Sequence, residues 1–322
     1  MATLIALLTA VVTVGIGLAA TPSASAKPDL ETVKKQVAKL DQQAEAASER
    51  YNDAKVKVDA TQTKLVALNA DLTRQQTLVD GMRKQVAAML VDQYQGNALS
   101  TASQVILSDN PDAFLDNLNA VASYNSQRGQ VLKAYGTQLD RLKLRKAAVK
   151  DEADRLRGIE SQMKADKQEI DTKAAKARKV LDGLEAAARA KILGGDYTGP
   201  VPNVDATGRA AIAVRYAMAQ VGKAYVYGAS GPSAFDCSGL TMRAWGAAGV
   251  GLPHSSNAQQ GSGMRVSESE LQPGDLVFYY SPVSHVGMYI GNGLIVNAEN
   301  PSAGVRVTTL HAMPYAGAVR PG

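Results

Sequence analysis

Cysteine is almost absent from this 322-residue chain, which contains only Cys237. A single cysteine cannot form a disulfide within the chain, so the fold does not depend on one. In a protein of an oxidising compartment, a lone cysteine is either a small buried side chain or a reactive thiol. Histidine is scarce as well, with three residues, and their spacing from the cysteine matches no zinc-binding motif. The sequence therefore predicts no metal site.

The second half of the chain lacks an excess of charge of one sign. Residues 194–322 contain seven basic and seven acidic residues, whereas residues 27–193 contain 28 Lys and Arg against 23 Asp and Glu. No aromatic-basic motif accompanies this modest excess, so we expect no nucleic-acid binding. The excess is typical of a solvated helical face, or of weak attraction to anionic wall polymers or lipid head groups.

Long apolar runs are limited to one, at residues 4–20. The small residues Ala24, Ser25 and Ala26 follow it and match the pattern that signal peptidase accepts. We therefore expect residues 1–26 to be a cleaved signal peptide, which makes the mature chain a secreted, extracellular or cell-wall protein. The alternative is a permanent membrane anchor, but 17 residues is at the lower limit for spanning a bilayer.

A seven-residue apolar repeat dominates the first half of the chain. Eighteen positions in alternating steps of three and four include sixteen apolar residues. The positions are 30, 33, 37, 40, 44, 47, 51, 54, 58, 61, 65, 68, 72, 75, 79, 82, 86 and 89. A period of about 3.5 residues indicates a coiled-coil helix. A second, weaker run between Leu118 and Leu184 has compatible spacing with polar interruptions.

Helix-breaking residues separate the two runs. Residues 96–100 interrupt the helix, and Pro111 occupies a first-turn position of the next one. The simplest arrangement is an all-α antiparallel coiled-coil hairpin over residues 27–193, although the same repeat is compatible with dimerisation. Glycine and proline then predict a linker at residues 194–205, and a second domain covers residues 206–322.

Helices precede strands in the second domain. Residues 206–220 and 240–248 have helical periodicity. Short β-like runs follow, bounded by turn residues, at residues 275–280, 285–290, 294–298 and 304–308. This order of elements predicts an α+β fold.

Cys237 directly precedes the second of these helices, and His285, 48 residues later, begins a strand. The free amide groups and dipole of a helix N-terminus favour the thiolate, so we expect the pKa of the thiol to lie below the ordinary value of about 8.5. A histidine at a strand end can point to that helix terminus and exchange the thiol proton. The pair predicts a nucleophile and its base, and an inert buried thiol is the alternative.

Four motifs of the second domain occur in a recognisable order. They are Tyr225-x-Tyr227-Gly228, Asp236-Cys237-Ser238-Gly239-Leu240, Leu271-Gln272-Pro273-Gly274-Asp275-Leu276-Val277-Phe278 and His285-Val286-Gly287-Met288-Tyr289-Ile290-Gly291-Asn292-Gly293. In these motifs the chain resembles the NlpC-type, papain-like cysteine peptidases that cut bacterial cell-wall peptides, over about residues 206–320. The resemblance implies a papain-like α+β catalytic domain that needs no cofactor.

The resemblance also implies roles for individual residues. Cys237 would be the nucleophile and His285 the base. The third polar residue, which orients the imidazole, falls at Asn297, where histidine is commoner in the family. An amide oxygen can also accept the imidazole N–H. Glu299 is the substitute candidate, and Asn297 as a strand-edge residue is the other interpretation.

Further residues near the thiol match the family motifs. Tyr225 corresponds to a tyrosine that helps to bind the oxyanion, although aromatic packing is the alternative. Asp236 and Ser238 would line the peptide-binding cleft. The remaining histidines, His254 and His311, lack the strand context, and we expect them on the surface or in loops.

The function that the resemblance implies is a secreted peptidoglycan endopeptidase for cell-wall remodelling or daughter-cell separation. It would hydrolyse the stem peptide between D-glutamate, through its γ-carboxyl, and meso-diaminopimelate. A papain-like amidase or acyltransferase on another substrate is a related alternative. A non-catalytic coiled-coil adaptor that binds the wall is an alternative of a different class.

The expected partners are the peptidoglycan stem peptide and a membrane protein that binds the coiled coil. The linker between hairpin and catalytic domain is only about a dozen residues, which holds the two parts at a high effective concentration. We therefore expect the hairpin to cover the cleft partly until the membrane partner rearranges it. The alternative is that the hairpin is only a spacer or a dimerisation element.

Overall fold

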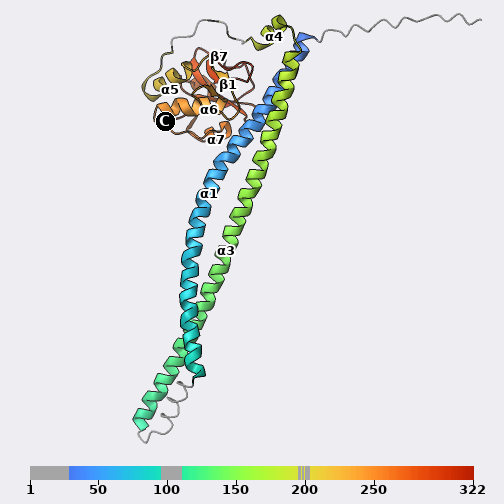
Figure 1. Ribbon diagram of the computed structural model, residues 1–322. Coiled ribbons are helices and arrows are strands. Elements are labelled where there is room, and N and C mark those ends of the chain that lie inside the picture. Colours follow the sequence, from blue (N-terminus) through green and yellow to red (C-terminus); the bar gives the residue numbers. More distant parts are fainter. Residues whose placement is uncertain (1–28, 96–110, 195–196, 198, 200–203) are drawn as a thin grey trace, which may run out of the picture.

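The computed structural model describes residues 29–95, 111–194, 197, 199 and 204–322. It shows a long helical hairpin with an α+β domain packed beside one end of it (Figure 1). The expected signal peptide and the expected helix break at residues 96–100 lie outside the described residues. Within the described ranges, no helix combines the length and apolarity needed to cross a membrane.

The hairpin consists of α1 (Leu30–Tyr94) and α3 (Pro111–Asp182), which run side by side (Figure 1). All eighteen predicted heptad positions of α1 are buried or partly buried. Ion pairs between the helices match early residues of α1 with late residues of α3, which makes the helices antiparallel: Arg50 with Asp166 at 2.9 Å, Lys64 with Glu152 at 2.6 Å, and Asp71 with Arg145 at 2.6 Å. The structure thus confirms the antiparallel helical hairpin and the start of its second helix at Pro111.

The second helix ends earlier than expected. It stops at Asp182, and a turn leads into a separate short helix, α4 (Ala186–Leu193). Leu184 and Ile192 pack against a small apolar cluster of Val33, Val37 and Leu181 near the start of α1. The turn therefore allows the chain to cover the open end of the hairpin, which a straight helix to residue 193 would leave exposed.

The second domain has the predicted α+β class. Its helices are α5 (Gly208–Met218), α6 (Cys237–Ala247) and the short α7 (Ser256–Gln259), with a 3-10 turn at Glu268–Glu270. Its main sheet is antiparallel and has the order β3-β8-β4-β5-β6-β7. The strands are β3 (Met264–Val266), β4 (Leu276–Tyr279), β5 (His285–Gly291), β6 (Leu294–Ala298), β7 (Val305–Thr309) and β8 (Tyr315–Arg320). A separate parallel pair, β1 (Ala224–Tyr225) and β2 (Ala234–Phe235), precedes α6.

The core of the domain lies between α5, α6 and the main sheet. Alternate residues of β5, Val286, Met288 and Ile290, share this cluster with Leu240 of α6. Trp245 of α6 is also buried there, and its indole N–H donates to the carbonyl oxygen of Gly274 at 3.2 Å. This packing fixes the N-terminus of α6 beside the first residue of β5, which brings Cys237 and His285 to the same end of the sheet.

Candidate active site

Cys237 is the first residue of α6 and has no exposed surface. The carboxylate of Asp236 caps the helix, since its Oδ1 accepts a hydrogen bond from the amide of Gly239 at 2.6 Å. Gly239 lies so close to the preceding loop that a β-carbon there would overlap the carbonyl oxygen of Ala229. The cap and this close approach place the thiol at a helix N-terminus, as the sequence predicts.

His285 begins β5 and is fixed by a chain of hydrogen bonds. Its Nε2 lies 3.0 Å from Oδ1 of Asn297 on β6. The amide nitrogen of Asn297 donates to Oγ1 of Thr308 on β7 at 2.8 Å, which turns the amide oxygen towards the imidazole. Nε2 therefore carries a proton, and Nδ1 is the atom that faces the thiol. Glu299, the other candidate for this position, pairs with Arg306 at 3.1 Å.

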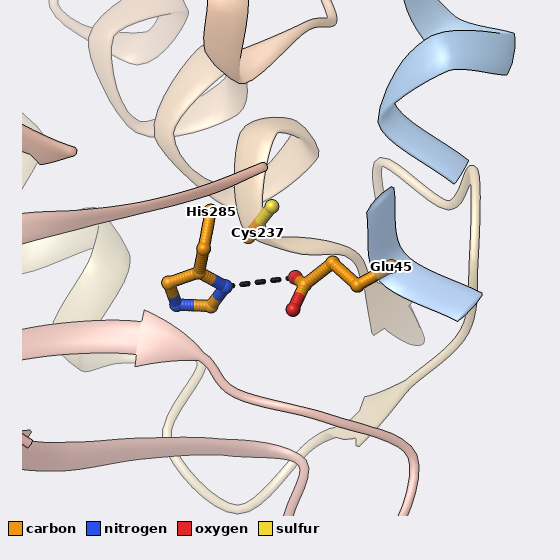
Figure 2. A group of neighbouring side chains, drawn as sticks. All are labelled: Glu45, Cys237 and His285. Atoms are coloured by element: carbon orange, nitrogen blue, oxygen red, sulfur yellow. Dashed lines mark hydrogen bonds and ion pairs between the residues drawn. The ribbon is translucent and has the colours of Figure 1, made fainter. Parts of the chain in front are cut away.

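A residue that the sequence analysis missed completes the cluster. Glu45 of α1 places Oε1 2.7 Å from Nδ1 of His285 (Figure 2). Tyr225 donates its hydroxyl to the same oxygen at 3.2 Å. Ligand atoms of Glu45, Cys237 and His285 all lie within 4.8 Å of one another. A carboxylate from the hairpin thus occupies the space beside the thiol and the imidazole.

Glu45 belongs to a polar stripe of α1 that is separate from the heptad positions. Five buried residues with helical spacing form this stripe: Asp41, Glu45, Ser48, Glu49 and Asn52. Polar side chains at such a spacing are ordinarily the solvent-facing side of a surface helix. Their burial shows that α1 has two packed faces, one against α3 and one against the catalytic domain. The carboxylates at every fourth residue, from position 41 to position 53, are the signal that could have revealed the second face.

Glu49 holds α1 directly over the cysteine. Its Oε1 accepts a hydrogen bond from the hydroxyl of Ser238 at 2.8 Å and lies 3.6 Å from Sγ of Cys237. Its Oε2 accepts a hydrogen bond from the backbone amide of Ser256. Ser238, which we expect to line the peptide-binding cleft, has the hairpin as its partner here.

Two further residues extend the contact on either side. Asn52 donates its amide to Oδ2 of Asp236 at 3.1 Å. Asp53 accepts hydrogen bonds from the hydroxyl of Ser255 and, at 3.1 Å, from the amide of Asn257. Two turns of α1 are therefore anchored to both the α6 terminus and the α7 segment.

Asp236 is placed differently from the prediction. Asp236 is fully buried and caps α6 instead of lining an open cleft, and its Oδ2 also accepts from the amide of Gly228 at 2.9 Å. His254 lies in a loop, as expected, and its Nε2 is 2.8 Å from Oδ1 of Asp236. Capping, burial and this ion pair make Asp236 a structural anchor of the loop before Cys237. His311 is exposed, as expected.

The electrostatics of this closed arrangement oppose a thiolate. Burial raises the pKa of the Cys237 thiol well above its ordinary value, and the carboxylates of Glu49, Glu45 and Asp236 raise it further. The predicted lowering of the thiol pKa is therefore wrong for this arrangement, because burial and the carboxylates outweigh the helix terminus. Burial on its own would lower the pKa of His285, but the Glu45 carboxylate and the hydrogen bonds of the imidazole raise it.

Access to the site is closed. Cys237, His285 and Asn297 have no exposed surface, so a substrate can reach them only after α1 moves. This confirms that the hairpin covers the cleft, and the cover is complete at these three residues. Beside Glu45, a cavity of about 370 Å³ remains between α1 and the catalytic domain, and its lining includes Asp41, Tyr280, Glu299 and Arg306.

The second half of the chain is similar to known proteins. Residues 222–319 match the model of the NlpC/P60 family. The Listeria monocytogenes protein named "Probable endopeptidase p60" is 48% identical over 97 residues, which are 30% of this chain and 20% of that protein. The Corynebacterium glutamicum protein named "Probable endopeptidase Cgl2188" is 44% identical over 104 residues, which are 32% of this chain and 50% of that protein.

A solved structure is similar over the same region. The crystal structure of the NlpC/p60 domain of peptidoglycan hydrolase SagA is 32% identical, and the match covers 34% of this chain and 97% of that chain with a TM-score of 0.33. This chain covers between a fifth and a half of the two curated relatives. The family match leaves out the helical hairpin. Residues 222–319, where the thiol, the imidazole and the amide converge, therefore form a domain of the NlpC/P60 family.

Proposed function

We propose that this protein is a secreted peptidoglycan endopeptidase of the cysteine type. The observation that carries the proposal is the meeting of a helix-terminal thiol, an imidazole with Nδ1 towards it, and an amide oxygen on the other imidazole nitrogen. Such a group of side chains suits nucleophilic attack on an amide carbonyl. The names of the relatives, two probable endopeptidases and a peptidoglycan hydrolase, support the substrate class.

The reaction begins once α1 has left the cleft. Nδ1 of His285 takes the thiol proton, and Sγ of Cys237 attacks the scissile carbonyl. The imidazolium then gives this proton to the leaving amine, and an acyl-enzyme remains. Water, deprotonated by the same nitrogen, releases the acid. Asn297 keeps the imidazole orientation through both steps, and the Tyr225 hydroxyl, freed from Glu45, donates to the oxyanion.

The finer assignments follow the family resemblance. The bond cleaved is that between the γ-carboxyl of D-glutamate and meso-diaminopimelate, in the cell wall, and the process is wall remodelling or daughter-cell separation. The apolar segment 4–20 and the small residues after it support secretion. We keep a membrane protein as the partner of the hairpin, because the hairpin exposes apolar side chains such as Leu90, near the end of α1, and Leu132 of α3. The hairpin extends well beyond the catalytic domain (Figure 1).

In this proposal α1 keeps the enzyme latent. Glu45 and Glu49 form hydrogen bonds with active-site groups that would otherwise contact the substrate. Cleavage therefore requires displacement of the hairpin. The non-catalytic adaptor is the competing function, and the aligned thiol and imidazole argue against it.

The proposal is tested by mass spectrometry of purified wall peptides incubated with three full-length proteins. The wild type should cleave slowly, and a Glu45→Ala/Glu49→Ala protein should cleave at least tenfold faster, because it loses the hydrogen bonds that hold α1 over Cys237. Cys237→Ala in the double-variant background should be inactive. Absence of cleavage by the wild type and by the double variant would favour the adaptor, and cleavage by the Cys237→Ala protein would exclude the thiol mechanism.

A further inference from the structure

We propose that Glu45, Cys237 and His285 form a binding site for a zinc ion, and that this site exists only while α1 is docked. Glu45 comes from the hairpin, and Cys237 and His285 come from the catalytic domain. The two ligands of the catalytic domain are about 190 and 240 residues from Glu45 in the sequence. The ligand spacing along the sequence therefore does not reveal the site. The three ligand atoms converge in the fold, within 4.8 Å of one another (Figure 2).

The three ligand atoms lie near the spacing that a tetrahedral ion requires. Zinc holds nitrogen, oxygen and sulfur ligands at about 2.0–2.3 Å, which places its ligand atoms roughly 3.3–3.8 Å from one another. The separation of 2.7 Å between Nδ1 of His285 and Oε1 of Glu45 must open by about half an ångström, which a small rotation of the Glu45 side chain provides. The fourth position is left to water or to Glu49, whose Oε1 lies 3.6 Å from Sγ.

Hydrogen bonds from a surrounding layer of residues already orient the ligands. Metal-binding histidines ordinarily donate their other ring N–H to an oxygen acceptor, which fixes the tautomer. Here the acceptor is Oδ1 of Asn297, so the lone pair of Nδ1 points towards the thiol and Glu45. The Tyr225 hydroxyl holds the Glu45 carboxylate in place. The arrangement that positions the imidazole for proton transfer therefore also positions it for a metal.

Charge favours a divalent cation at this position. Among the residues that the structure describes, no Lys or Arg forms an ion pair with Glu45 or Glu49, and both carboxylates are buried against Cys237 and Asp236. His285 is the cationic partner that the described contacts give Glu45, and burying two carboxylates with so little counter-charge is costly. A zinc ion with one thiolate, one carboxylate and one neutral imidazole forms a group of zero net charge. A set of sulfur, nitrogen and oxygen ligands suits zinc, whereas magnesium and calcium prefer oxygen alone.

Metal binding and docking of α1 strengthen each other by linkage. An ion that binds only the docked form shifts the equilibrium towards that form, and docking raises the affinity for the ion by the same factor. Binding releases the thiol proton, because zinc binds the thiolate. That zinc would deepen latency rests on the proposed function, whereas the site itself does not.

Cobalt(II) titration of the full-length protein tests the site, because thiolate-bound Co²⁺ has a charge-transfer band in the near ultraviolet and a tetrahedral site has strong visible bands. The wild type should show both at one ion per chain, and zinc should displace the cobalt. Cys237→Ser should lose the charge-transfer band. Glu45→Gln should lower the zinc affinity at least tenfold, since changes even to residues behind metal ligands cost 10- to 100-fold.

The matched control is Asp53→Asn, which makes the same change of chemistry in the same helix and interface but away from the three ligands. It should lower the affinity far less than Glu45→Gln, after circular dichroism has shown that both variants are folded. Equal losses would mean that docking alone matters, and would overturn Glu45 as a ligand. A wild type without the charge-transfer band would overturn the site. Neither result depends on wall cleavage, so a protein that cleaves peptides but binds no zinc refutes only this inference.

Discussion

The neighbours of the Cys237 thiol have opposite effects on its ionisation. His285 can accept its proton, whereas burial disfavours the thiolate and Glu49 and Glu45 add to that effect. The helix terminus on its own favours the thiolate by a smaller amount, because the dipole interaction is typically about 0.3–1 kcal/mol. The state of the thiol therefore depends on whether α1 is docked.

Glu49→Gln should increase the rate of Cys237 alkylation at pH 7 at least tenfold in metal-free protein. The change removes the carboxylate nearest to Sγ and weakens the bonds to Ser238 and Ser256, so it both favours the thiolate and opens the cleft. The rate is measured with an alkylating reagent over a range of pH. Glu31→Gln, an equal charge change at an exposed residue of the same helix, is the control. Equal rates for Glu49→Gln and the wild type would contradict the electrostatic role.

Asn297→Ala should lower kcat by about 10- to 1,000-fold in the Glu45→Ala/Glu49→Ala background, because the imidazole loses its orienting acceptor. Glu299→Ala should have a much smaller effect, since Glu299 pairs with Arg306 in the closed structure. Wall-peptide cleavage under saturating substrate measures both. The reverse order of effects would assign the orienting role to Glu299.

At the scale of elements, α1 is unusual in having two packed faces. Its apolar heptad face packs on α3, and its polar stripe from Asp41 to Asn52 packs on the catalytic domain. On the other side of this contact, α6 supplies the thiol from its first turn, where glycine allows a close approach of the preceding loop.

Two glycines of α6 should respond oppositely to alanine. Gly239→Ala should destabilise the domain by at least 1–3 kcal/mol, because the new methyl group meets the backbone at Ala229 and lies 2.8 Å from Oδ1 of Asp236. Gly246→Ala, in the same helix with open space around it, should stabilise the domain by about 0.4–1 kcal/mol. Urea unfolding followed by fluorescence of Trp245, the single tryptophan, reports on this domain. A destabilised Gly246→Ala or an unaffected Gly239→Ala would refute the packing argument.

In the whole molecule, a short linker joins the hairpin to the catalytic domain whose cleft the hairpin covers. A linker of this length maintains an effective concentration on the order of millimolar, so a contact with a Kd of about 10 µM would keep the cleft closed about 99% of the time. Opening is therefore controlled by modest changes in the contact. Protonation is one such change, because the contact is rich in carboxylates.

Closure should weaken as the pH rises between about 4 and 7. Burial, Glu45 and Glu299 raise the pKa of Asp41 to about 7 in the docked form, whereas released Asp41 should titrate near 4. Between these two pKa values, the docked form holds a proton that the released form has lost. Each rise of one pH unit therefore lowers the equilibrium constant for docking of α1 up to tenfold per such group. Burial and Asp236 raise the pKa of Glu49 as well, with the same sign.

Small-angle scattering of metal-free protein should then show a more extended molecule at pH 8 than at pH 5. Asp41→Asn should reduce this change, because the amide does not titrate. The basic residues Lys34 and Arg306 line the same cavity. A molecule that compacts as the pH rises would contradict the assigned sign.

Local patterns in the sequence were sufficient for much of this structure. The heptad spacing predicted α1 and its face against α3, and turn residues and alternation predicted β4 to β7. The motif around Cys237 placed the thiol at a helix terminus, and the position of Asn297 near His285 followed from family resemblance. The very short strands β1, β2 and β3, and the small residues of β8, carry too weak a local signal and were missed.

The relation between the two halves of the chain depends on how they pack in three dimensions. Glu45 and Glu49 are ordinary polar residues of a helix surface until the catalytic domain covers them. Their distance to Cys237, and with it the raised pKa of the thiol, depends on a contact between segments almost 190 residues apart. Neither helical periodicity nor strand alternation predicts such a contact, because both patterns indicate only which side of a helix or strand is apolar. The reactive groups were therefore determined by the sequence alone, and their closed state by how the hairpin and the domain pack.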